Sequence, residues 1–191
     1  MIQHHIDLGL ALRRSVSDMF SDLVTRPTGA AVRQEIEQQL AAVQDSTLTV
    51  IDFSHVGLLD FSCADEVVAK LLLRCISDAG SPVGFFIFRG MREEHLDAIE
   101  AVLERRGLVL LVQTPDGMVR VVGELGKRER AAWEALDRTG GMDHSALAHL
   151  LECSREEALR ALDNLCARRL ALRLEESYLA IGNALLARGI Q

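Results

Sequence analysis

The chain has 191 residues, of which 49% are hydrophobic and 26% are charged, a composition that excludes a disordered or coiled-coil protein. The formal charge is −7. Neither half of the chain is basic overall: there are 11 basic against 17 acidic residues in 1–123, and 10 against 11 in 124–191. This balance weakens a nucleic-acid function without excluding it, because local patches of charge matter more than totals. No apolar run approaches the ~20 residues of a bilayer span and no secretory signal is visible, so we expect a cytoplasmic protein without membrane contact.

The first part of the chain alternates between strand-like and helix-like patterns. Apolar, β-rich runs predict strands at 48–53, 83–88, 107–113 and 118–122, and helical patterns separate them at about 29–43, 62–79 and 92–106. Continuous apolar strands separated by helices indicate a largely parallel sheet, and the Thr114-Pro-Asp-Gly117 turn adds a hairpin at its edge. We therefore predict an α/β domain over residues 1–123, with a mixed sheet and covering helices.

A helix start follows the strand at 48–53 after a short loop. Ser62-Cys-Ala-Asp65 has a spacing like that of a capping box, in which the serine hydroxyl accepts a hydrogen bond from a free N–H group. The aspartate favours the positive end of the helix dipole. We expect Ser62 to cap this helix, and the corner at Asp60 to face outward.

From about Gly126 the pattern becomes helical and the strands shorten. Helices are predicted at 127–138, 144–151 and 154–168, and two short strands at 170–174 and 178–181. Three helices followed by a hairpin are typical of a winged helix-turn-helix. The sequence therefore predicts a small winged-helix domain over residues 124–191.

The segment from Val50 to Val68 resembles the central strand, loop and helix of STAS domains, a family named for sulfate transporters and anti-sigma-factor antagonists. In that family the loop carries an aspartate followed by serines, and Asp60 and Ser62 match these positions. The resemblance covers residues 1–123. It is closest to STAS-like proteins with a Thr-Arg-Pro-Thr-Gly segment, which stands here at 25–29.

This resemblance implies a non-catalytic bacterial regulator that binds a protein partner through the loop residues Asp60, Phe61 and Ser62. In the anti-sigma antagonists the phosphorylated hydroxyl directly follows the loop aspartate, and Phe61 stands at that position. Phenylalanine cannot accept phosphate, which puts the family's phosphorylation switch in doubt. Ser62 is then either a helix cap or an alternative acceptor.

The segment from Thr25 to Arg33 has two interpretations. A proline in the first helical turn leaves N–H groups free for an anion, and arginines add charge-assisted hydrogen bonds. In this interpretation a nucleotide or other anion is bound by Thr25, Arg26, Thr28, Gly29 and Arg33. In the other, Thr25 or Thr28 caps a helix while the arginines pair with Asp22 or Glu37. The glycine patterns of nucleotide-binding loops are absent.

The winged helix is predicted either to read DNA or to dock a protein. In a DNA-reading motif the third helix enters the major groove, and the candidate contacts here are Arg155, Arg160, Arg168 and Arg169. Glu156 on the same helix and the acidic turn Glu175-Glu176 oppose contact with phosphates. A helix of mixed charge with an acidic wing suits protein docking or self-association as a homodimer.

Catalysis finds little support in the sequence. The six histidines show no metal-ligand spacing, and no G-x-S-x-G pattern accompanies a serine. The four cysteines lie in apolar helical patterns and are expected to be buried: Cys63, Cys75, Cys153 and Cys166. We expect no catalytic residues, no metal and no cofactor.

The leading hypothesis is a regulator acting through protein contacts, with a DNA-binding transcription regulator and a nucleotide or anion binder as alternatives.

Overall fold

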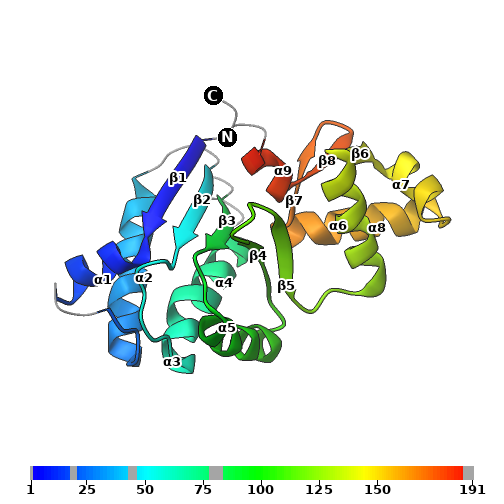
Figure 1. Cartoon of the computed structure of the whole chain (residues 1–191). Coiled ribbons are helices and arrows are strands. Elements are labelled where there is room, and N and C mark those ends of the chain that lie inside the picture. The colour runs from blue at the N-terminus through cyan, green and yellow to red at the C-terminus, as the bar shows by residue number, and fades with distance from the viewer. Residues whose placement is uncertain (1, 18–20, 43–46, 78–83, 187–191) are drawn as a thin grey trace. The chain divides into compact units, whose positions relative to one another are not determined.

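A computed structural model of the chain describes residues 2–17, 21–42, 47–77 and 84–186. The chain divides into two units, Met1–Glu124 and Leu125–Gln191 (Figure 1). The mixed α/β fold expected from the sequence is confirmed: helices cover a five-stranded mixed sheet in the first unit, and a three-stranded antiparallel sheet stands in the second. The expected helix end and strand start between 78 and 83 lie outside the described residues.

The sheet of the first unit keeps the order of the chain, β1-β2-β3-β4-β5. Its strands are β1 (Ile2–Asp7), β2 (Thr47–Asp52), β3 (Gly84–Arg89), β4 (Val109–Gln113) and β5 (Val119–Gly123). The first four strands are parallel, and β5 pairs antiparallel with β4 as the hairpin at the edge. The turn between them therefore has the role predicted from its proline and glycine.

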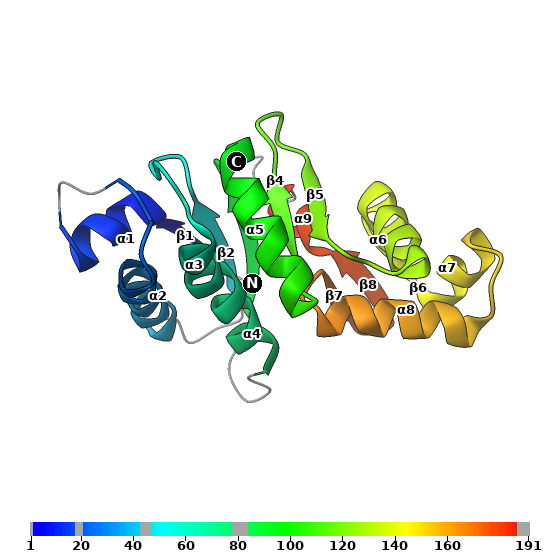
Figure 2. The same ribbon diagram turned by 90° about the horizontal axis from the view of Figure 1, so that it is seen from below.

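The helices of the first unit lie on one face of this sheet (Figure 2). They are α1 (Leu8–Ser15), α2 (Arg26–Ala41), α3 (Phe61–Ala64), the π-helical turn η1 (Asp65–Ala69), α4 (Lys70–Ser77) and α5 (Glu93–Arg106). Right-handed crossovers between parallel strands that follow chain order place successive helices on the same side. Where the sequence predicted a single helix at 62–79, the structure has three consecutive segments, α3, η1 and α4. Helix α1 was not predicted from the sequence.

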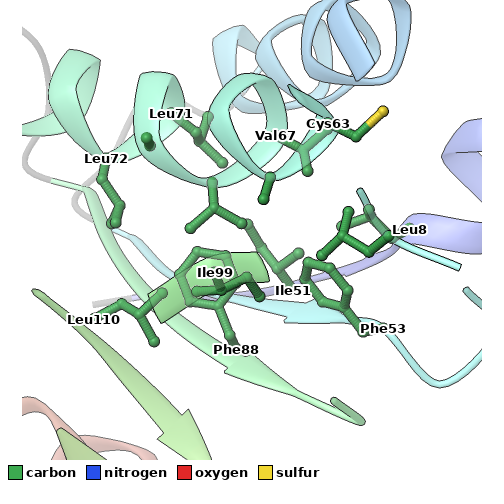
Figure 3. Close-up of a cluster of buried hydrophobic side chains, with 14 of the residues drawn as sticks. Leu8, Ile51, Phe53, Cys63, Val67, Leu71, Leu72, Phe88, Ile99 and Leu110 are labelled. Atoms are coloured by element: carbon green, nitrogen blue, oxygen red, sulfur yellow. The ribbon is translucent and has the colours of Figure 1, made fainter. Parts of the chain in front are cut away.

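The core of the first unit lies between these helices and the sheet (Figure 3). Val67 and Leu71 point from the α3–η1–α4 helix toward Ile51 and Phe88 on the strands, and Ile99 joins them from α5. All five are buried. Truncating such a side chain to alanine typically costs ~2–5 kcal/mol, so this packing fixes where α3 begins relative to the end of β2.

The second unit consists of four helices and three short strands in the described residues 125–186. They are α6 (Lys127–Thr139), β6 (Met142–Asp143), α7 (His144–Leu150), α8 (Arg155–Ala167), β7 (Ala171–Leu174), β8 (Ser177–Ala180) and α9 (Ile181–Leu186). β8 pairs antiparallel with both β6 and β7. Leu136, Leu147 and Leu162 are buried, one on each of the first three helices. The helices and hairpin lie close to the ranges expected from the sequence.

The cysteines differ from the expectation. Cys63 is buried, but Cys75, Cys153 and Cys166 are half-buried, so the prediction of four buried thiols is wrong for three of them. None of the four forms a disulfide.

Over the described ranges, no helix combines the length and apolar character needed to cross a membrane.

Candidate functional site

The loop that leads into α3 is held by a short ladder with a segment that precedes α2. Leu23 and Leu59 form an isolated parallel bridge. The Leu23 N–H donates to the Leu58 carbonyl at 2.8 Å, and the Asp60 N–H donates to the Leu23 carbonyl at 2.9 Å. The backbone therefore enters α3 in a fixed position, although neither segment belongs to the main sheet.

Gly57, which precedes Asp60 in the same loop, is held against the start of α5. Its carbonyl accepts hydrogen bonds from Arg92 and from Nε2 of His95, the latter at 2.7 Å. Nδ1 of His95 accepts from the Arg92 backbone N–H at 3.3 Å, so the imidazole carries its hydrogen on Nε2. His95 is buried, and its ring joins the Gly57 carbonyl to the backbone at the start of α5.

Asp60, not Ser62, caps the helix at this corner. Asp60 has an extended backbone, and its side chain accepts from the Cys63 N–H at 2.8 Å. The Ser62 hydroxyl donates to the two Asp60 carboxylate oxygens at 3.0 and 3.1 Å. The expectation that Ser62 is the cap is therefore wrong: a carboxylate accepts more strongly than a hydroxyl, and Asp60 is the residue with cap geometry.

Three large apolar side chains are exposed around this cap: Leu58 is 57% exposed, Val24 46% and Phe61 36%. Leu23 and Leu59 point inward from the ladder, so their neighbours Val24 and Leu58 lie on its outer side. We call this surface the α3 corner and define it as Val24, Leu58, Asp60, Phe61 and Ser62. Sequence reasoning found its last three residues but missed Val24 and Leu58, because they stand in a leucine-rich pattern that suggests burial.

The Thr-Arg-Pro-Thr-Gly segment forms the start of α2 and packs against the same corner. Thr25 is the N-cap, with its side chain accepting from the Thr28 N–H at 3.4 Å. The Cys63 thiol donates to the Thr25 carbonyl at 2.9 Å. A Cβ at Gly29 would lie 3.0 Å from the Cys63 Cα, so glycine allows α2 and α3 to approach closely.

Both arginines of this segment are engaged by carboxylates. Nη1 of Arg26 donates to Asp65 at 3.1 Å and to Glu66 at 2.8 Å. Arg33 donates to Glu66 at 3.3 Å and to Glu37 at 2.7 Å. The pairing of Arg33 with Glu37 was one of the two interpretations considered from the sequence. Asp22, in contrast, accepts from the Leu58 N–H.

Asp65 and Glu66 are buried on the π-helical turn, 4% and 2% exposed, and α2, α4 and α5 each supply at least one cation to them. Arg106 of α5 donates to Asp65, and Lys70 of α4 pairs with Glu66. Burial alone would raise the pKa of Asp65, but the hydrogen bonds from Arg106 and Arg26 outweigh it and lower the pKa. The pKa of Glu66 is lowered in the same way, against burial, chiefly by Lys70 and Arg26. Both groups are therefore carboxylates at neutral pH.

A second polar cluster lies where β1, β2 and β3 end. Asp52 accepts from Ser54 at 2.6 Å and pairs with Arg89 at 2.8 Å. Burial opposes ionisation, but these hydrogen bonds lower the pKa of Asp52 to about 2. On β1, Asp7 lies 2.8 Å from Nδ1 of His55. No group of three or more metal-ligating side chains occurs within the described ranges.

In the second unit, Arg155 and Arg160 are exposed on the first half of α8. The Glu157 side chain is engaged by neighbouring residues: it completes a capping box with Ser154 and pairs with Arg128 of α6. Glu156 remains exposed beside the two arginines.

The other two arginines considered for DNA lie at the end of α8. Arg168 is 3.9 Å from Glu129, and Arg169 has a positive φ of 61° in the turn toward β7. Glu175 and Glu176, in the turn between β7 and β8, are exposed. The exposed charges of this surface are therefore mixed.

The chain matches no model of a known protein family, and no curated protein resembles it closely enough to count as a match.

Proposed function

We propose that this chain is a non-catalytic bacterial regulatory protein whose first, STAS-like unit binds a protein partner through the α3 corner. The observation that carries the proposal is the exposure of Leu58, Val24 and Phe61 beside the Asp60 cap. Adjacent large apolar side chains at a protein surface are typical of an interaction site.

The rigidity of the corner supports the same proposal. Backbone hydrogen bonds hold Leu23 against Leu58 and Asp60, and the side chains of Arg92, which precedes α5, and His95 on α5 hold Gly57. A surface that is already ordered loses little conformational entropy when a partner binds, so more of its contact energy appears as affinity.

For the second unit we propose a winged helix that serves docking or self-association. The element order α6, β6, α7, α8, β7, β8, with β8 between the other two strands, supports this architecture. Exposed apolar side chains, Leu150 at the end of α7 and Leu174 on β7, support contact with a protein.

A capture experiment with matched variants tests the α3 corner. The full chain is immobilised as wild type, as the double variant Leu58→Asp/Phe61→Asp, and as Met118→Asp. Met118 is also 57% exposed but lies in the turn between β4 and β5, so it controls for adding a charge to an exposed apolar position. We expect proteins of a cytoplasmic extract that bind both the wild type and the Met118 variant to be lost from the double variant. If the double variant folds and retains every one of them, the α3 corner is not the contact.

DNA binding is the second candidate function. The specific observation in its favour is that Glu157 is paired with Arg128 and Ser154, so Arg155 and Arg160 have one fewer carboxylate beside them on the exposed face of α8. The exposed Glu156 opposes it, since a carboxylate that faces phosphates is repelled.

A further inference from the structure

Three arginines border the apolar part of the α3 corner. The Arg105 guanidinium lies 5.9 Å from the centre of the Phe61 ring, in a cation–π arrangement. Arg26 and Arg106 both donate to Asp65, which follows Phe61 by four residues and therefore lies one helical turn away. All three arginines are exposed.

Charge and burial are distributed unequally among these groups. The carboxylates of Asp65 and Glu66 are buried, whereas the Arg26 side chain is 51% exposed and that of Arg106 39%. Both hydrogen bonds of Arg26 use Nη1, and half of its side chain remains exposed to solvent. A protein of formal charge −7 thus presents guanidinium groups to solvent beside an apolar patch.

The cationic side of the surface is the C-terminal end of α5, not its start. At the start of α5, Glu93 and Glu94 are exposed, and Arg92 lies 3.7 Å from Glu94. At the end, the exposed Glu104 stands in sequence beside Arg105 and Arg106, and it reduces the positive charge without cancelling it.

We infer that the partner of the α3 corner is an acidic segment with apolar side chains, whose carboxylates bind Arg26, Arg105 and Arg106 while its apolar groups cover Leu58 and Phe61. This inference rests on the proposed function and specifies the chemistry of the partner. Arginine forms two parallel hydrogen bonds to a carboxylate, and arginine with aromatic side chains dominates many protein interfaces. The negative charge of the rest of the chain repels an acidic partner at long range, so these local cations decide whether it binds.

Three synthetic peptides of about 18 residues test this inference. They share one face of leucine and phenylalanine at helical spacing, and their flanking positions carry glutamate, glutamine or lysine. Fluorescence anisotropy with the full chain at low salt measures their affinities. We expect the glutamate peptide to bind about tenfold more tightly than the glutamine peptide and the lysine peptide to bind more weakly still, with the differences shrinking as salt is added.

Two variants locate the binding. Arg105→Glu is expected to weaken the glutamate peptide about tenfold and to strengthen the lysine peptide, because it reverses one charge at the corner. Arg120→Glu on β5 reverses another exposed arginine of the first unit and should leave both affinities unchanged. Phe61→Ala is expected to weaken all three peptides.

The possible results separate this inference from the proposed function. Equal affinities for the three peptides, all lost in Phe61→Ala, would show that the corner binds apolar groups but would overturn the acidic partner. Binding of the glutamate peptide that is insensitive to both Arg105→Glu and Phe61→Ala would place it elsewhere and overturn the inference. The absence of binding by any peptide at 1 mM would overturn it as well, while the capture experiment would still decide the proposed function.

Discussion

Arg106 donates from both Nε and Nη2 to the same carboxylate oxygen of Asp65, at 3.1 and 2.8 Å. This contact joins the C-terminal end of α5 to the π-helical turn η1. Asp65 is 4% exposed, so its charge requires compensation inside the protein, and Arg26 supplies the rest of it.

We predict that Arg106→Met destabilises the protein by about 1–2 kcal/mol. Breaking a fully buried pair costs ~3–5 kcal/mol, but the Arg106 side chain is partly exposed and Arg26 remains as a partner, so the loss is smaller. Urea unfolding followed by circular dichroism measures it. Arg120→Met is the control, and an equal midpoint for both variants would contradict a structural role for this pair.

Acid should destabilise the protein through carboxylates whose pKa is low in the folded state. The pKa of Asp52 is about 2, against 3.8 in its ordinary state, because hydrogen bonds from Ser54 and Arg89 outweigh its burial. A depressed folded pKa contributes stability that is present above the unfolded pKa and is lost as pH falls through the folded one. For Asp52 the contribution is on the order of 2 kcal/mol, and it disappears between about pH 4 and pH 2.

Asp52→Asn isolates this contribution. We expect the variant to be less stable than the wild type at pH 6 and the difference to shrink on approach to pH 2, where the wild-type carboxylate becomes protonated. Thermal melts at a series of pH values measure the difference. A gap that stays constant across this range would mean that Asp52 acts through packing and not through its charge.

Gly29→Ala should destabilise the protein although alanine is the better helix former by ~1 kcal/mol. The added Cβ would lie 3.0 Å from the Cys63 Cα and 3.1 Å from the Glu66 Cβ, so α2 would have to move away from α3 and η1. Overpacking of this kind typically costs ~1–3 kcal/mol. A raised melting temperature would show that the two helices separate without cost.

The sequence was sufficient for the layers of the fold because the strands are continuous apolar runs and the helix starts carry caps. It was insufficient at the α3 corner. Asp60 and Ser62 both suit an N-cap, and the choice between them depends on the two backbone hydrogen bonds that Leu23 forms with Leu58 and Asp60, which fix where the loop ends. That contact joins segments more than thirty residues apart, and no local pattern records it.

The partners of Arg26 were missed for the same reason. Asp22 is close to Arg26 in sequence, but the partners of Arg26 are Asp65 and Glu66, because α2 packs against η1. The π-helical turn that carries these two residues is also not visible in a hydrophobic pattern. Tertiary packing therefore decides which of several plausible ion pairs forms.

Cys63 should react slowly with thiol reagents. Burial and the nearby Asp60 carboxylate raise the pKa of its thiol to about 12, so almost none of it is thiolate at pH 8. We expect mass spectrometry after iodoacetamide treatment to find Cys63 unmodified in the folded protein and modified after denaturation. Cys166, with a pKa raised to about 11 mainly by burial, should behave in the same way. Rapid labelling of Cys63 would mean that the contact between α2 and α3 opens in solution.

DNA binding by the full chain should be weak. The exposed Glu156 and Asp163 lie on the same helix as Arg155 and Arg160, and the exposed Glu175 and Glu176 lie in the turn between β7 and β8. These carboxylates repel phosphates.

A gel-shift assay with random 30-base-pair duplexes checks this expectation, and we expect no shift at 10 µM protein and 150 mM salt. The DNA hypothesis predicts instead a shift whose affinity falls steeply with salt, because each phosphate contact releases counterions, and which Arg160→Ala abolishes. Arg138→Ala is the matched control, since Arg138 is exposed at the end of α6 and donates to a carbonyl of its own helix. A salt-dependent shift lost only in Arg160→Ala would therefore make DNA reading, and not protein docking, the function of the second unit.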